Sequence, residues 1–488
     1  MNKTKWFEDA LLINRDPNWY GLVTRDLSSA EAAEAAARAF FAQFTQDRIT
    51  DMQLCVFENT AIIPSDAVMW RGFKYLQTEE NGHPVSYPQL EGLYRIYAEL
   101  GVDPVQIFID TMRAGGVRPW ITLRMNDAHF GGDETAFLRD DFFYTAEKNG
   151  WMIGEEYGYF SHCLDYGQEP VRARILALIR EITGKYDIFG LELDFMREIH
   201  SFDYRHNADR HAIMTAFIGE VHEILCEAQV RLGHPLRLMI RTPRDIADTE
   251  AFGFDICRWA ENGWVDAVVP TPRWEVTDDA IPVAEWKARL GDGVAVFPGI
   301  EILHLRFTHV TRDIAKAYSA AWNAQGADGL YFNNHDYATP LHKQVYTLHR
   351  DNVTEGVRRY IVTYQDISAG DAASPCYRPL PMAVDGEGEL SFQVGPIRGT
   401  DRLTVLLDFA GDAAPKLTCG GIAAADGVLS PAVTGNHVDD DTPIALTDGA
   451  STYAYRCDGV QTDGALTLTL AGHGELRYLE LRIGETKE

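Results

Sequence analysis

The chain has 488 residues, of which 46% are hydrophobic and 11% aromatic, a composition typical of a globular protein with more than one hydrophobic core. Asp and Glu number 72 against 44 Lys and Arg, so the formal net charge is −28. A surface of this sign repels nucleic acids and anionic membranes, which excludes both as expected partners.

The cysteines and the N-terminal residues indicate the cellular compartment. Seven cysteines are scattered without a CxxC pair or a metal-ligand spacing, which indicates reduced thiols. The start, MNKTKWFEDALLINRDPNWY, has no apolar signal-peptide core, and no apolar run approaches the roughly 20 residues of a membrane span. We therefore expect a cytoplasmic protein. A homo-oligomer is compatible with the sequence, which leaves the oligomeric state open.

Up to about Gln344 the sequence alternates helical patterns with short apolar strands. The predicted strands are Gly21–Thr24, Met52–Phe57, Val117–Leu123, Ile188–Phe195, Leu236–Ile240, Val265–Val269, Val294–Phe297 and Gly329–Phe332. The predicted helices are Ser28–Phe44, Asp103–Ala114, Val171–Thr183, Asp209–Leu232, Ile281–Leu290 and Thr311–Gln325. Eight strands in this alternation predict an α/β fold, a (β/α)8 TIM barrel, over residues 1–350. A doubly wound open sheet also alternates, but no GxGxxG phosphate loop follows any strand.

Two later stretches depart from this alternation. Residues 127–169 are rich in Phe, Tyr and Trp, and such a loop either stacks on sugar rings or forms a small satellite core. From about Asn352 the helical periodicity gives way to period-2 runs such as Leu403, Val405 and Leu407. We predict a connecting segment over residues 351–375 and a C-terminal antiparallel β-sandwich over residues 376–488.

Polar and charged residues follow the predicted strands, whose carboxyl ends form the active site in barrel enzymes. Glu192 and Asp194 lie on one face of a buried strand, because residues two apart share a face. Two buried carboxylates cost several kcal/mol unless they are paired or used, so they indicate a site. The other candidates are Arg124, Asn126, Asp127, His129, Arg197, Arg241, Arg273, Trp274, Glu275, Glu301, His304, Asn333, Asn334 and His335. The predicted first strand would contribute Arg25 and Asp26.

Two carboxylates that flank a glycosidic bond act as an acid with a nucleophile, or as an acid with a base. Asp194 on the fourth strand and Glu301 after the seventh lie on nearly opposite walls of an eight-stranded barrel. We predict that they are the catalytic pair of a glycoside hydrolase acting on an oligosaccharide, with the other candidates binding substrate. Glu192 lies deeper and is predicted to partner an arginine. Glu58, Asp127, Glu275 and Asp336 are alternatives for the second carboxylate.

Five arginines near strand ends suggest the charge of the substrate: Arg124, Arg197, Arg241, Arg244 and Arg273. Guanidinium forks match carboxylates, so we expect an anionic sugar such as a uronic acid. The alternative is that each arginine pairs with a site carboxylate and holds it ionised.

Two functions of other classes also fit a barrel with polar strand ends. A non-catalytic carbohydrate-binding barrel would still bind sugar after Asp194→Asn, and a metal-dependent lyase or isomerase would lose activity with EDTA. Histidines 129, 200, 304 and 335 would be the metal candidates, but no HxH follows the first strand and no HExxH occurs. We therefore predict neither a metal nor another cofactor.

Three segments carry a resemblance to a known family. GLELDFMR, ITLRMNDAH and WAENGWVDAVVPTPRW, on the fourth, third and sixth predicted strands, resemble the family 10-like glycosyl-hydrolase barrels and, more distantly, clan A glycosidases, over Asp51 to Asp336. The resemblance implies an acid/base after strand four and a nucleophile after strand seven, at Asp194 and Glu301. Strand four departs from clan A, because it carries Asp where that clan has an Asn-Glu pair. Other barrel glycosidases use an Asp on strand four as the nucleophile, in which case Asp194 attacks and Glu275 or Glu301 donates the proton.

Overall fold

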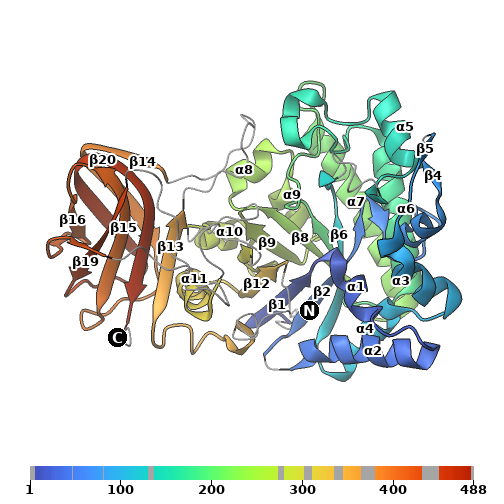
Figure 1. Ribbon diagram of the computed structural model, residues 1–488, viewed down its shortest axis with the longest axis horizontal. Helices are drawn as coiled ribbons and strands as arrows, with labels where there is room; N and C mark the ends of the chain where they lie inside the picture. The colour runs from blue at the N-terminus through green and yellow to red at the C-terminus, as the bar shows by residue number, and fades with distance from the viewer. Residues whose placement is uncertain are drawn as a thin grey trace.

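The computed structural model describes residues 6–46, 48–80, 82–129, 137–272, 280–301, 310–334, 345–363, 380–430 and 450–484. It consists of an α/β domain and a C-terminal antiparallel sheet, which lie side by side (Figure 1). Within these ranges, none of the helices combines the length and the apolar character that a membrane crossing requires.

A parallel sheet forms the centre of the α/β domain. In spatial order its strands are β10 (Ala295–Val296), β9 (Ala267–Thr271), β8 (Arg237–Pro243), β7 (Gly190–Asp194), β6 (Arg118–Arg124), β2 (Asp51–Glu58), β1 (Ala10–Arg15), β12 (Gly329–Asn333) and β11 (Gly299–Glu301). A short strand, β3 (Thr60–Ala61), pairs antiparallel with β2. Only Phe297 and Pro298 separate β10 from β11, so the two ends of this order are consecutive in the chain. The sheet is therefore curled, and the domain is barrel-like.

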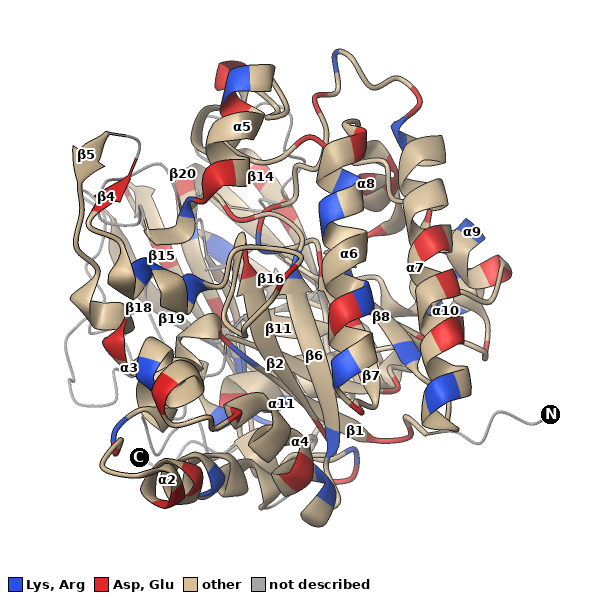
Figure 2. Ribbon diagram, turned by 90° about the vertical axis from the view of Figure 1, so that its right-hand side faces the viewer, with Lys and Arg blue, Asp and Glu red and all other residues tan. Residues whose placement is uncertain are grey.

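Helices cover the outside of the curled sheet. They are α1 (Tyr20–Val23), α2 (Ala30–Ala42), α3 (Glu91–Tyr94), α4 (Pro104–Ala114), α5 (Asp141–Asn149), α6 (Glu169–Lys185), α7 (Arg210–Leu232), α8 (Ile246–Ala251), α9 (Ile256–Glu261), α10 (Val283–Leu290) and α11 (Arg312–Ala324). A small hairpin, β4 (Glu79–Glu80) with β5 (His83–Pro84), projects from the β2–α3 segment. Charged residues lie along the outer helices, whereas the strands carry few (Figure 2). This distribution is what amphipathic helices around a buried parallel sheet require.

The inner face of the sheet is apolar towards the amino ends of the strands. Trp120, Met239 and Tyr331, from three different strands, and Phe297, which directly follows β10, belong to one buried cluster, and Trp6 and Phe189 pack against it. The Arg118 guanidinium lies 5.3 Å from the centre of the Trp6 ring. This end of the domain is filled by side chains, which leaves the carboxyl ends of the strands to carry chemistry.

Gly190 begins β7 opposite Trp120 of β6. A Cβ on Gly190 would lie 2.2 Å from Cζ3 of the Trp120 ring, closer than van der Waals contact allows. We expect Gly190→Ala to lower the free energy of unfolding by about 1–3 kcal/mol, because the added methyl overpacks the core. Urea denaturation measures the change. The matched control is Gly184→Ala in α6, where a Cβ meets nothing within 4 Å; it should leave stability unchanged or raise it by about 1 kcal/mol. Equal effects at the two positions would contradict the expectation.

The first strand lies earlier than the pattern predicts. Gly21–Thr24 is predicted as a strand, but the structure places helix α1 there and makes Ala10–Arg15 the strand. The prediction is wrong because Asp16 accepts a hydrogen bond from Asn18 N and starts the 3-10 turn Pro17–Trp19, which continues directly into α1. Each of the seven other predicted strands overlaps an observed one.

The C-terminal sheet is built on one long strand, β20 (Ala465–Ile483). The other strands are β13 (Arg358–Thr363), β14 (Met382–Gln393), β15 (Leu403–Gly411), β16 (Lys416–Cys419), β17 (Ile422–Ala423), β18 (Val428–Leu429) and β19 (Ser451–Cys457). β14 pairs along the first part of β20, and β13 pairs with its last part. The predicted sandwich is not confirmed, because the described strands all connect through β20 into one antiparallel sheet. β13 joins this sheet although it falls in the predicted connecting segment.

Helix α11 joins the two parts of the molecule (Figure 1). Tyr318 of α11 donates a hydrogen bond from its hydroxyl to Ile361 O of β13 at 2.7 Å. Gly395 approaches so closely that a Cβ there would lie 2.5 Å from the Ala320 Cβ. The C-terminal sheet therefore braces the α/β domain at this helix, whatever else it does.

Candidate active site

Asp194, the last residue of β7, is a buried carboxylate surrounded by donors. Arg241 at the end of β8 places Nη1 3.0 Å from each carboxylate oxygen. Oδ1 also accepts hydrogen bonds from Met196 N at 2.8 Å and Arg197 N at 3.1 Å. These four contacts all stabilise the ionised carboxylate. Oδ1 accepts three of them and Oδ2 one, so Oδ2 keeps more capacity for a further partner.

Arg124, at the end of β6, gathers carboxylates from three other segments. Its Nη1 lies 2.8 Å from Glu58 Oε1 and 3.2 Å from Asp127 Oδ2, and its Nη2 lies 2.8 Å from Asp16 Oδ2. Asn334 Oδ1 accepts from the same Nη2 at 3.3 Å. Burial raises the pKa of Glu58 and Asp127, but the pKa of both is held below its usual range by the nearby cations and hydrogen bonds. The result is a network of ion pairs and hydrogen bonds around Arg124 at the carboxyl ends of β1, β2, β6 and β12.

His129 is the most exposed member of this network, with 36% of its side chain accessible. Nδ1 lies 2.6 Å from Asp127 Oδ1 and 3.5 Å from Glu58 Oε1. Burial lowers the pKa of His129, but the hydrogen bonds to these two carboxylates outweigh burial and raise it to about 9. Arg197, whose Nη2 lies 2.5 Å from Nε2, opposes this shift. His129 is therefore a group of raised pKa at the point where the network meets solvent.

Glu192 lies one step deeper than Asp194 on the same face of β7. Its Oε2 accepts hydrogen bonds from Asn14 Nδ2 at 3.1 Å and from Thr122 Oγ1. Oε1 faces the Tyr331 hydroxyl without forming an ordinary hydrogen bond. Burial, and next the charge of Asp194, raise the pKa of Glu192 to about 7. The predicted pairing of Glu192 with an arginine is not what the structure shows, because Asn14 and Thr122 hold its carboxyl group.

The raised pKa of Glu192 sets a pH dependence of stability. Its pKa of about 7 is above the ordinary 4.5, so the stabilisation is full below pH 4.5 and is lost as pH rises through 7. A shift of this size corresponds to about 3 kcal/mol. We expect Glu192→Gln, which mimics the protonated side chain, to flatten the fall in melting temperature between pH 5 and 8. Exposed Glu285 provides the control, because Glu285→Gln should leave the wild-type profile unchanged. Parallel wild-type and Glu192→Gln profiles would contradict the expectation.

Not every predicted site residue faces the site. Asn126 is fully buried, and its side chain hydrogen-bonds only to backbone atoms among the described residues. Its Nδ2 donates to Leu164 O and His200 O, and its Oδ1 accepts from Leu164 N. It holds two loops together and is unsuited to contact substrate. Arg124, Asp127, His129, Glu192, Asp194, Arg197, Arg241 and Asn334 share the contacts given above, and Asn333 ends β12 beside Asn334. Arg273, Trp274, Glu275, His304 and His335 lie outside the described residues, as does the side chain of Glu301.

The contacts of the arginines favour pairing with protein carboxylates over binding of an anionic sugar. Arg124 and Arg241 pair with site carboxylates, Arg197 lies 3.6 Å from Asp127 Oδ2, and Arg244 lies 2.9 Å from Asp245. A guanidinium that neutralises a protein carboxylate has less charge to offer a ligand. Arg273 falls outside the described residues.

Glu58, Asp127 and His129 are the one group of described residues whose ligand atoms lie close enough for a metal ion, within 4.8 Å of one another. Arg124 already lies 2.8 Å from Glu58 and 3.2 Å from Asp127, and Arg197 contacts His129. A divalent cation would have to displace two guanidinium groups and a proton. The three side chains therefore already have cationic partners in Arg124 and Arg197.

The described aromatic residues of the 127–169 segment form small cores. Tyr157 and Phe160 pack with Ala128, Ile153 and Cys163, and a second cluster contains Leu138 and Phe143. Tyr159 is half exposed and donates to Glu198 Oε1 at 3.1 Å. These contacts favour the satellite core over a row of sugar-stacking rings.

Several site residues are missing from the predicted set, namely Asn14, Asp16, Thr122 and Tyr331. Asp16 follows no predicted strand, because the predicted first strand, Gly21–Thr24, lies after it in the chain. The run ALLINR, Ala10–Arg15, is the signal that would have found it, since Asp16 follows it directly. Asn14, Thr122 and Tyr331 lie inside strands, where a polar residue alone does not indicate function.

No family model and no curated protein matches the sequence. Among solved structures, an alpha-L-fucosidase from Vibrio sp. strain EJY3 is similar with a TM-score of 0.39 and 10% identity, over 99% of this chain and 97% of that one. The PgaB (BpsB) glycoside hydrolase domain from Bordetella bronchiseptica gives a TM-score of 0.41 and 9% identity, over 70% and 98%. A cycloisomaltooligosaccharide glucanotransferase from Paenibacillus sp. gives 0.35 and 12%, and the similarity covers 96% of this chain but only 57% of that enzyme. Because these TM-scores are low, we base the function on the site residues.

Proposed function

We propose that the chain is a glycoside hydrolase whose α/β domain is a (β/α)8 barrel, with β10 and β11 counted as one strand. The observation that carries the proposal is Asp194, a buried carboxylate at the carboxyl end of β7 that accepts hydrogen bonds from Arg241 and from two backbone amides. A carboxylate placed by a guanidinium and backbone donors at the strand ends suits a nucleophile in glycoside hydrolysis. Oδ2 is the attacking atom, because Oδ1 already accepts three hydrogen bonds.

The second carboxylate of the proposal is Glu301. β11 pairs with β12 in a register that sets Glu301 opposite Asn333, the last residue of that strand. The position is thus at the carboxyl end of the sheet, as an acid/base requires. Glu275 remains the alternative donor. Asp127 and Glu58 are less suited to donate a proton, because their lowered pKa keeps them ionised.

The preference for an anionic sugar remains a prediction. It requires that a substrate carboxylate compete with the protein carboxylates already bound to Arg124 and Arg241. Comparing kcat/KM on uronate-containing and neutral oligosaccharides tests it, and equal values would remove it. The cytoplasmic location and the oligomeric state also remain predictions.

A turnover screen of the wild-type chain against neutral and uronate-containing oligosaccharides tests the proposed function, with Glu301→Gln beside it. Release of a reducing end by the wild type and its loss in Glu301→Gln are the expected results. Binding without turnover would replace the proposal with the non-catalytic barrel. Because Glu58, Asp127 and His129 could serve a metal, an EDTA arm is included, and loss of activity there would favour the metal-dependent alternative.

A further inference from the structure

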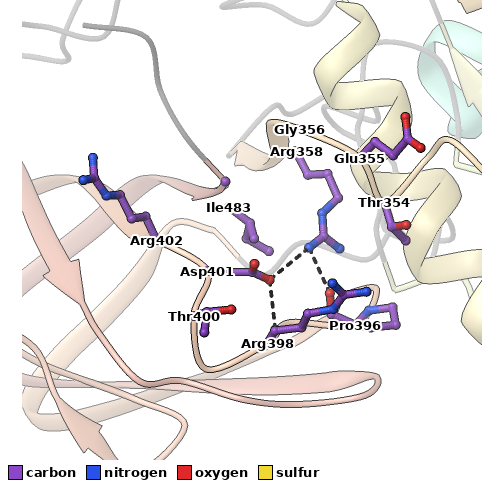
Figure 3. Close-up of a pocket in the computed structure, with 11 residues that line it drawn as sticks. Thr354, Glu355, Gly356, Arg358, Pro396, Arg398, Thr400, Asp401, Arg402 and Ile483 are labelled. Atoms are coloured by element: carbon purple, nitrogen blue, oxygen red, sulfur yellow. Dashed lines mark hydrogen bonds and ion pairs between the residues drawn. The ribbon is translucent and has the colours of Figure 1, made fainter.

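A pocket of about 650 Å³ lies at the edge of the C-terminal sheet (Figure 3). Its walls are the segment before β13, the loop between β14 and β15, and the end of β20. None of its lining residues belongs to the candidate active site. Its volume is within the range of pockets that bind small molecules.

Arg358 of β13 is a buried cation in this pocket, with 3% of its side chain exposed. Its Nη2 donates to Pro396 O at 2.9 Å and lies 3.9 Å from Asp401 Oδ2. Nε and Nη1 have no hydrogen-bond partner among the residues the structure describes. Buried guanidinium donors without acceptors cost free energy, so Arg358 keeps an uncompensated positive charge beside the pocket.

The charges around Arg358 leave positive charge in excess. Figure 3 shows its guanidinium directed towards Asp401, with Arg398 and Thr400 nearby and Arg402 pointing away. Behind it, the buried ammonium of Lys316 contacts Glu355 O. Burial lowers the pKa of Lys316; the charge of Asp313 raises it, and the charges of Arg312 and Arg358 lower it. Glu355, Arg398 and Arg402 are exposed and Asp401 is half-buried, so solvent screens these charges more than that of buried Arg358.

We propose that this pocket binds the oxyanion group of a small molecule, a carboxylate or a phosphate, through Arg358 and Arg398. Guanidinium donors match the oxygens of both groups, and Thr400 adds a hydroxyl donor. The proposal is independent of the reaction at the strand ends.

Calorimetric titration of the full chain with inorganic phosphate, glucuronate and glucose, at constant ionic strength, tests this inference. We expect at least one of the two anions to bind and glucose not to bind. Binding of phosphate alone identifies a phosphate group as the ligand, and binding of glucuronate identifies a carboxylate. Binding of neither anion, or equal binding of glucose and glucuronate, would overturn the proposal.

Variants locate the binding. Arg358→Gln and Arg398→Gln should each weaken anion affinity at least about tenfold, whereas Arg456→Gln, an exposed arginine of the same sheet, should not. If Arg358→Gln does not fold, the anion affinity of Arg398→Gln tests the proposal, because Arg398 is exposed. Loss of anion affinity in the Arg358 and Arg398 variants, which lie outside the strand-end site, places the bound anion in this pocket. Unchanged affinity in both the Arg358 and Arg398 variants would refute the proposal.

Discussion

Replacing Asp194 by Asn should lower kcat/KM by at least about three powers of ten, or about 4 kcal/mol of transition-state stabilisation, on any glycoside that the wild type cleaves. Asn keeps the shape of the side chain and can still accept from Met196 N and Arg197 N. It cannot attack an anomeric carbon, and it leaves the Arg241 charge without its carboxylate. Initial rates at several substrate concentrations measure the change and separate kcat from KM.

Asp187→Asn is the matched control, because Asp187 precedes the same strand at its opposite end. It pairs with Arg113 at 2.7 Å and with His234 at 2.6 Å, and it is exposed. We expect full activity in this variant. A loss shared by both variants would show that activity falls with general damage to β7. Full activity in Asp194→Asn would remove Asp194 from the chemistry.

Replacing Arg124 by Met should lower the free energy of unfolding by about 3–5 kcal/mol, the cost of leaving buried charges without a partner. Arg124 contacts Asp16, Glu58 and Asp127 within 3.2 Å, and its own side chain is buried. Met fills a similar volume without charge, so lost packing contributes little. Urea denaturation at neutral pH measures the effect.

The pH dependence of the same variant provides a second measure. The folded-state pKa of Glu58 and that of Asp127 are lowered, so their stabilisation is present above the ordinary carboxyl pKa and is lost as pH falls below it, through the lowered folded-state pKa. The difference in the free energy of unfolding between wild type and Arg124→Met should therefore become smaller at acidic pH. Arg95→Met is the control. Arg95 pairs with Glu91 and Glu99 on the surface, and its loss should cost less than about 1 kcal/mol. Equal costs at Arg124 and Arg95 would contradict the buried network.

Local patterns were enough to locate most of the strands and several of the site residues. Seven of the predicted strands overlap observed ones because a short apolar run between helical patterns reports burial on both faces of a parallel sheet. Arg124, Asp194 and Arg241 were found because each ends such a run. The miss at Gly21–Thr24 has a local cause as well, since four apolar or small residues fit one turn of helix as well as a strand.

Contacts between distant residues were beyond the reach of these patterns. The residue pattern predicts arginines that bind substrate. In the structure Arg124 instead contacts Asp16 and Glu58, which are 108 and 66 residues away in the chain. Asn126 has the same polar character as its neighbours, and only the approach of Leu164 and His200 shows that it holds loops together.

The sequence by itself determined the alternation of strands and helices, the polar ends of the strands, and the excess of negative charge, because these depend on residue type and spacing along the chain. Tertiary structure alone decided which charges neutralise one another, that the pKa of Glu192 is raised, and how β20 unites the C-terminal strands. The physical reason is that ion pairing and desolvation depend on distances across the folded sheet, which residue order does not specify.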